Sequence, residues 1–168
     1  MTKLSHPDQF HLRAALGWLE LGNPREAELE LDQISVELRG DPDVLEIRWH
    51  IEAAARKWEA CVELADTIIK RDPARPEAWI HRSFALHELK RTQEAFDQLL
   101  PVAKRWPVIW TIPYNLACYM AQLGRLEESA GWLKRARKID PKRVAAEAKD
   151  DPDLLPLFNR KDGDNTAQ

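Results

Sequence analysis

The sequence has little cysteine, little glycine and no long apolar stretch. Its two cysteines, Cys61 and Cys118, are too few for a disulfide framework and too far apart for a CxxC pair, so we expect reduced thiols. Six glycines in the whole chain leave little material for a phosphate-binding loop. No run of about 18 apolar residues occurs, and the segment after Met1 has no apolar signal-peptide core. We therefore expect a cytoplasmic protein with no membrane association.

An excess of charge of one sign is also missing. The chain has 25 basic and 28 acidic residues, interspersed along its length, for a net charge of -3. Such a surface has no general attraction to a phosphate backbone, so nucleic acid is not the expected partner. The GxSxG, HExxH and paired CxxC patterns of common enzymes do not occur either. We expect no catalytic activity and no cofactor.

What the sequence does contain is helical periodicity. Apolar residues at spacings of three and four recur in segments such as 12–21 and 60–69, whereas the alternation typical of a β-strand is absent. Proline residues stand where helices are expected to start or stop, as at Pro42, Pro76 and Pro141. The pattern predicts an all-α protein.

A period of 34 residues organises these helices. Pro73, Pro107 and Pro141 follow one another at this interval. A small residue recurs at the same interval near the start of the second helix of each unit. These residues are Ala27, Cys61, Ala95 and Ser129. Small side chains at this position let two antiparallel helices approach closely.

The repeat resembles the tetratricopeptide repeat family, whose unit is a helix-turn-helix with the pattern W-x2-L-G-x2-Y, then A-x3-F, A and P. The third unit matches at Trp79, Ser83, Leu86, Ala95, Leu99, Val102 and Pro107. The fourth unit matches at Leu116, Ala117, Gly124, Ser129, Leu133, Ala136 and Pro141. The resemblance covers residues 8–141. It implies a right-handed α-solenoid of four antiparallel helix pairs, followed by a C-terminal capping helix.

The resemblance also sets the expected boundaries. It implies a single domain over 1–158, with repeats at about 8–41, 42–75, 76–109 and 110–143, a cap at 144–158 and a polar tail at 159–168. The expected helices are 8–21, 24–38, 42–55, 58–71, 76–89, 92–105, 110–123 and 126–139. In the cap, we expect Leu154, Leu155, Leu157 and Phe158 to cover apolar surface of the last helix pair.

Two repeats depart from the family pattern. The first lacks the final proline and continues through residues 35–42, so we expect its second helix to be longer than usual. The second repeat has Arg48, Trp49 and Glu52 where the family prefers leucine, a small residue and an aromatic one. We expect the first helix of that repeat to be shifted or loosely packed.

Members of this family typically bind an extended peptide or a partner helix in a concave groove lined by their first helices. The resemblance therefore implies a non-catalytic protein–protein interaction module, an adaptor, scaffold or assembly subunit. The groove positions expected to contact the partner are Leu12, Leu16, Asp43, Glu46, His50, Glu77, Ile80, Phe84, His87, Glu88, Tyr114 and Cys118. This set has carboxylates and apolar side chains but no lysine or arginine, which favours a basic partner segment with apolar anchors.

Two alternatives stay open. In one, the groove carboxylates are a solvated face or are neutralised by neighbours such as Arg13, Arg48 or Arg82. In the other, the protein is a ligand- or metal-binding regulator, and His50, His87 and Cys118 supply ligands from successive repeats. Neighbouring units are about 10 Å apart, whereas ligands stand about 2 Å from one ion, so we expect no metal at this set.

Overall fold

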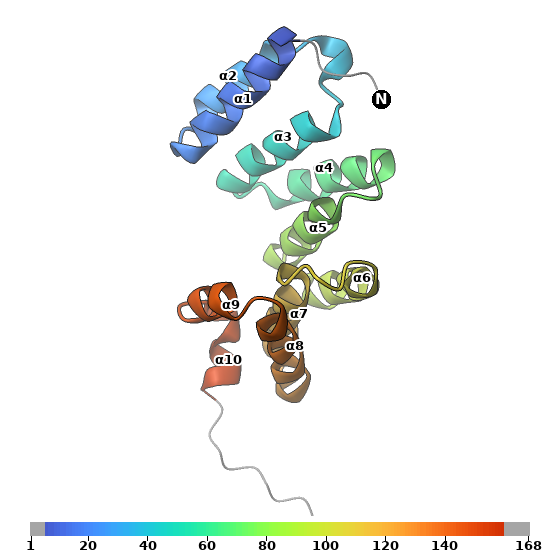
Figure 1. Ribbon diagram of the computed structural model, residues 1–168, viewed down its shortest axis with the longest axis vertical. Helices are drawn as coiled ribbons and strands as arrows, with labels where there is room; N and C mark the ends of the chain where they lie inside the picture. Colours follow the sequence, from blue (N-terminus) through green and yellow to red (C-terminus); the bar gives the residue numbers. More distant parts are fainter. Residues whose placement is uncertain (1–5, 160–168) are drawn as a thin grey trace, which may run out of the picture. The chain divides into compact units, whose positions relative to one another are not determined.

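The protein is built from α-helices joined by short turns. The computed structural model describes residues 6–159, and these residues contain no strand (Figure 1). This confirms the all-α, helical-repeat prediction. None of the described helices is long and apolar enough to cross a membrane.

The chain divides into two compact units, Met1–Leu89 and Lys90–Gln168. That residues 1–158 form a single domain stays a prediction. The polar tail expected at 159–168 lies, apart from Asn159, outside the described residues.

The first unit contains two complete helix pairs and the first helix of the third repeat. Its elements are α1 (His6–Glu20), α2 (Pro24–Asp32), the 3-10 helix η1 (Val36–Leu38), α3 (Pro42–Ala54), α4 (Trp58–Arg71) and α5 (Pro76–Glu88). Helix α1 packs on α2, α3 packs on α4, and α4 packs on α5. Apart from α2, each helix ends within two residues of the predicted positions.

The second unit contains the fourth helix pair and the C-terminal cap. Its elements are α6 (Thr92–Arg105), α7 (Thr111–Gln122), α8 (Leu126–Ile139), α9 (Pro141–Ala148), the 3-10 helix η2 (Pro152–Leu154) and α10 (Leu155–Phe158). Helix α7 packs on α8 and on α6, whereas η2 and α10 return to α7.

A residue in the left-handed backbone conformation follows the first helix of each repeat. These residues are Gly22 (φ 73°), Arg56 (φ 56°), Lys90 (φ 63°) and Gly124 (φ 76°). They stand 34 residues apart, which is the period of the sequence. Glycine adopts this conformation without steric cost, whereas Arg56 and Lys90 adopt it at a cost of about 1 kcal/mol. The turn conformation is therefore the same in all four repeats, although the residue type at this position differs.

The small residues at the start of the second helices are all fully buried, as predicted. They are Ala27, Cys61, Ala95 and Ser129. The Sγ atom of Cys61 lies 3.7 Å from the carbonyl oxygen of Trp49, and Ser129 Oγ donates a 2.8 Å hydrogen bond to the carbonyl oxygen of Ala117. In both repeats, the second helix therefore contacts the same backbone position of the first helix.

The second helix of the first repeat is shorter than predicted. Helix α2 ends at Asp32 instead of continuing to residue 38. Asp8, which is buried in α1, accepts a 2.8 Å hydrogen bond from the backbone N–H of Ser35. Arg39 donates hydrogen bonds to the carbonyl oxygens of Ile34 and Asp32. These contacts satisfy backbone groups at the helix end and stabilise a turn there.

The expectation of a shifted or loosely packed first helix in the second repeat was wrong. Helix α3 begins at Pro42, as the period requires, and buries Val44, Ile47 and Trp49. The large indole of Trp49 is accommodated because its ring stacks on His81 of α5, with centroids 4.0 Å apart. The next repeat, through α5, therefore supplies the surface on which Trp49 packs.

The predicted capping helix is α9, which contacts α8 and buries Val144 and Ala148. Beyond it, Leu154 is fully buried where η2 meets α7. Leu155 and Phe158, which were expected to be covered as well, remain 51% and 47% exposed. Leu154 therefore makes the main apolar contact of this segment.

Candidate functional site

The ninth position of the repeat is accessible throughout the first unit. It is occupied by Leu16, His50 and Phe84, and all three side chains are exposed. The exposed fractions of Leu16 and Phe84 are 47% and 36%, and Leu12 and Ile80 beside them are half-buried. The first helices of this unit therefore present apolar surface at repeat-equivalent positions.

The carboxylates of α3 are ion-paired with an arginine that the sequence analysis did not single out. Nη2 of Arg75 lies 2.7 Å from Oδ1 of Asp43, and its Nη1 lies 2.8 Å from Oε2 of Glu46. Its Nε also lies 3.6 Å from Oδ2 of Asp72. Three carboxylates surround one guanidinium group, so negative charge remains in excess around α3.

The arginines that were expected to neutralise the groove make other pairs. Arg48 lies 3.1 Å from Glu28, and Arg82 lies 2.7 Å from Asp66. Neutralisation of the α3 carboxylates by neighbours is therefore partial, and Arg75 supplies it.

The groove positions of α5 are in different environments. Glu77 is exposed, and Glu88 lies 3.5 Å from the exposed guanidinium group of Arg56. His87 is buried, with 4% of its surface exposed. A partner in the groove can reach Glu77 and Glu88, whereas His87 belongs to the packed interior.

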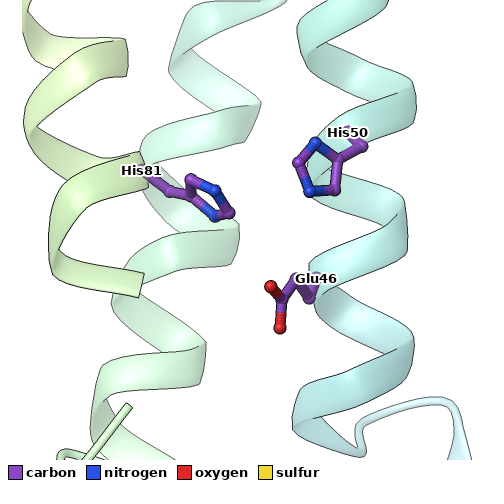
Figure 2. Close-up of side chains that lie close together, drawn as sticks. All are labelled: Glu46, His50 and His81. Carbon is purple, nitrogen blue, oxygen red and sulfur yellow. The ribbon is translucent and has the colours of Figure 1, made fainter. Parts of the chain in front are cut away.

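A cluster of potential metal ligands joins α3 and α5. Glu46 and His50 stand one turn apart on α3, and Figure 2 shows His81 of α5 reaching toward them. One ligand atom from each of the three side chains lies within 4.8 Å of the other two. The His50 and His81 rings are 5.0 Å apart and nearly perpendicular, and Trp49 stacks on the face of His81.

The pKa values of both imidazoles of this cluster are lowered. Desolvation, assisted by the nearby His50, lowers the pKa of His81 to about 3. Desolvation also lowers the pKa of His50, although the carboxylate of Glu46 acts in the opposite direction. At pH 7 the neutral form of each ring therefore predominates. In that form one ring nitrogen has a lone pair that can accept a hydrogen bond or bind a metal ion.

In the second unit, the chain covers its own groove positions. Tyr114 and Cys118 are buried, and both contact the carboxylate of Asp151: the phenol hydroxyl donates a 2.6 Å hydrogen bond, and the Cys118 Sγ lies 3.5 Å away. Gln122 donates a 2.9 Å hydrogen bond to the carbonyl oxygen of Asp153. Burial and the carboxylate raise the pKa of the Cys118 thiol, so it does not resemble an activated nucleophile.

A separate apolar cavity of about 380 Å³ lies in the second unit, and we call it the tryptophan cavity. Its apolar walls include Trp106, Pro107, Pro113 and Trp132. Its charged lining residues are Lys104, Arg135 and Lys138, and no carboxylate of the described residues lines it. The guanidinium group of Arg135 lies over the ring of Trp132, 4.4 Å from its centroid.

The site contains residues that sequence reasoning missed. Of the alternative ligand set His50, His87 and Cys118, at which no metal was expected, only His50 belongs to the cluster of potential ligands among the described residues. His81 was missed because it stands three residues before Phe84, the counterpart of His50 in the next repeat. The combined signal was a carboxylate and a histidine one turn apart, with a second histidine close to the same position in the following repeat.

The comparisons with known proteins concern the fold. No protein-family model matches the chain, and no curated protein matches it either. Among solved structures, PilF from Pseudomonas aeruginosa has a TM-score of 0.73 at 18% identity, over 91% of this chain and 72% of that one. MamA from Desulfovibrio magneticus RS-1 has a TM-score of 0.70 at 18% identity, over 95% of this chain and 99% of that one.

A MamA structure labelled AMB-1 is also similar, with a TM-score of 0.64 at 16% identity. PilF and MamA are both tetratricopeptide repeat proteins. At these identities, the comparison concerns architecture and not activity. The chain has the helical-repeat fold that its resemblance to the tetratricopeptide repeat family implied.

Proposed function

We propose that the protein is a non-catalytic interaction module, an adaptor, scaffold or assembly subunit, that binds a protein or peptide on the inner surface of its first helices. The observation that carries this proposal is the exposure of the ninth repeat position in the first unit. Leu16, His50 and Phe84 recur at the period of the sequence and are all exposed. Large apolar side chains placed regularly on one surface favour partner binding.

The charge around these positions favours a basic partner over nucleic acid. Asp43, Glu46 and Asp72 outnumber Arg75, and Glu77 adds an exposed carboxylate at the start of α5. A lysine or arginine of the partner would compete with Arg75 for these carboxylates, while leucine or aromatic anchors would pack on Leu16 and Phe84. The carboxylates would then control the association rate and its salt dependence, and the anchors would control the residence time.

A random-peptide display library selected against the purified chain tests the proposal. We expect enrichment of peptides with lysine or arginine spaced around leucine, isoleucine or aromatic residues. The Leu16→Ser and Phe84→Ser variants should each weaken binding of the selected peptides by about tenfold. Fluorescence anisotropy of labelled peptides measures the affinities.

Leu29→Ser is the matched control, because Leu29 of α2 is similarly exposed at 51% but is not a groove position. It should leave the affinities unchanged. A library that yields no enriched sequence, or peptides that bind the Leu16 and Phe84 variants as tightly as the unmodified protein, would refute the proposed groove.

A further inference from the structure

Three side chains of the first unit have the identity and spacing of an incomplete coordination shell. Glu46 and His50 are separated by four residues on α3, so their side chains lie on the same face of that helix. His81 approaches from α5, and ligand atoms of all three lie within 4.8 Å of one another. These three residues therefore come together from two successive repeats. The alternative set of His50, His87 and Cys118 was not expected to come close enough to bind one ion.

The orientation of His81 is fixed by its surroundings. Its ring stacks on Trp49 with an interplanar angle of 9°, which leaves the ring edges open to other groups. Its Nδ1 atom is buried and makes no hydrogen bond within the described part of the chain. A buried ring nitrogen without a partner is costly, so this atom requires an explanation beyond packing.

We propose that Glu46, His50 and His81 bind one divalent transition-metal ion, for which Zn²⁺ is the expected occupant. Two imidazoles and one carboxylate form a ligand set that suits Zn²⁺, and three protein ligands leave one coordination position open. Ligands about 2.1 Å from a tetrahedral ion are about 3.4 Å apart, so donor atoms that lie within 4.8 Å of one another must approach by up to about 1.4 Å. Because stacking on Trp49 fixes His81, rotation of the Glu46 and His50 side chains would have to supply this approach.

The charges around the cluster are compatible with a cation. Arg75 holds the Oε2 atom of Glu46 at 2.8 Å, which leaves the other carboxylate oxygen for the ion. The same guanidinium group is compensated by Asp43 and Asp72, so the surroundings remain negative overall. In the metal-bound state Arg75 acts as a positioning residue that orients the ligand Glu46.

Metal binding would link α3 to α5. Because its ligands come from two successive repeats, the ion would stabilise the folded first unit relative to the unfolded chain. Two of the ligands, Glu46 and His50, are groove positions. The open coordination position would therefore face the inner surface of the unit, and this inference stands independently of peptide binding.

Calorimetric titration of the tag-free, chelator-treated chain with Zn²⁺ tests the site. We expect one ion per chain, a rise of several degrees in the melting temperature, and a visible absorption band when Co²⁺ is used as the probe. The Glu46→Gln and His50→Gln variants should each weaken Zn²⁺ binding by at least about tenfold. The amide of the Glu46 variant can still accept a hydrogen bond from Arg75, so this variant should keep its fold.

His11→Gln is the control, because His11 belongs to the same unit but its Nδ1 atom is hydrogen-bonded to Oε2 of Glu30 at 2.8 Å. It should bind Zn²⁺ as the unmodified chain does. Absence of stoichiometric Zn²⁺ binding would overturn the proposal, as would equal affinity of the Glu46 and His50 variants and the unmodified protein. A loss of affinity in the His11 variant would assign the ion to another site.

The tryptophan cavity shares no residue with the cluster of Glu46, His50 and His81. Its apolar volume of about 380 Å³ is suited to one large side chain, and Trp106 and Trp132 provide aromatic walls. Its charged lining consists of Lys104, Arg135 and Lys138, without any carboxylate among the described residues. We infer that it binds an acidic peptide segment that inserts one aromatic or branched aliphatic side chain.

Two labelled model peptides with a single tryptophan anchor, one flanked by glutamate and the other by lysine, test the cavity. We expect the acidic peptide to bind more tightly, with an affinity that falls as salt increases. Trp132→Ala and Lys138→Glu should each weaken it by about tenfold. Arg137→Glu is the matched control, because Arg137 is exposed on the same helix but does not line the cavity.

Equal binding of the two peptides would overturn this inference, and so would unchanged affinity in the Trp132 and Lys138 variants. The groove variants at Leu16 and Phe84 should not affect the acidic peptide. The proposal for the cavity and the proposal for the groove can therefore be refuted separately.

Discussion

The phenol hydroxyl of Tyr114 donates a 2.6 Å hydrogen bond to the carboxylate of Asp151, which stands 37 residues later in the chain. Both Tyr114 and its neighbour Cys118 occupy positions where a groove ligand was expected. In the second unit these positions are therefore covered by the chain itself, through Asp151 and the adjoining η2, which contacts α7. The first unit, by contrast, has exposed groove positions at Leu16, His50 and Phe84.

This C-terminal contact predicts a strong difference between two adjacent leucines. Leu154 is fully buried and Leu155 is 51% exposed. Leu154→Ala should lower the free energy of unfolding by about 2–4 kcal/mol, because it removes buried apolar volume. Leu155→Ala should change it by less than about 0.5 kcal/mol. Urea denaturation followed by circular dichroism measures both, and equal effects would show that the segment is not packed as described.

The left-handed turns predict a stabilising substitution. Lys90 has φ 63° at the position that glycine occupies in the first and fourth repeats. Lys90→Gly should raise the free energy of unfolding by up to about 1 kcal/mol, because the relief of strain exceeds the added entropy of the unfolded chain. Gly124→Ala should lower it by about 1 kcal/mol. Thermal unfolding of both variants tests this pair. Destabilisation by Lys90→Gly, or stabilisation by Gly124→Ala, would contradict the repeat of the turn.

The thiols should be unreactive in the folded protein. Burial, and secondarily Glu52, raises the pKa of Cys61 to about 11. Burial, followed by Asp151, also raises the pKa of Cys118. At pH 8 both groups are therefore neutral thiols, whereas the thiolate is the reactive form. A coloured aromatic disulfide reagent should react slowly with the native chain and rapidly with both thiols in guanidinium chloride. Rapid reaction of either native thiol would disagree with this burial.

The groove carboxylates predict a salt-dependent effect on binding. In the double variant Glu46→Gln and Glu88→Gln, we expect the fold to remain intact, because neither carboxylate is fully buried. Binding of a basic peptide selected on the unmodified chain should weaken, with a shallower dependence on salt. Anisotropy titrations at two salt concentrations measure this. Unchanged affinity and salt response would mean that these carboxylates do not recognise the partner.

Much of the helical framework could be predicted from the sequence because its signals are local and periodic. The prolines and the small residues of the second helices occur every 34 residues, and helices α4, α6 and α8 have the predicted bounds. The end of α2 could not be predicted in this way. It depends on Asp8 and Arg39, which contact the turn after α2 from residues before and after that helix.

The candidate site was less predictable because it depends on contacts between repeats. The 34-residue period predicted which residues occupy groove positions. It did not predict which charged side chains lie next to them. Arg75 reaches Glu46 across 29 residues, and no family position indicated that pair. Trp49 was expected to disturb α3, yet it stacks on His81 and thereby orients that ring. The identity of a neighbour is set by side-chain packing, which a repeat pattern does not encode.

The contact between Tyr114 and Asp151 also has a consequence during synthesis. A chain grows at about 5–20 residues per second, so the 37 residues that separate the two side chains take roughly 2–7 seconds to add. Throughout that interval, the aromatic ring and the thiol of α7 lack the segment that later shields them. The Cys118 thiol is therefore more accessible in the growing chain than in the finished protein, where it is buried against Asp151.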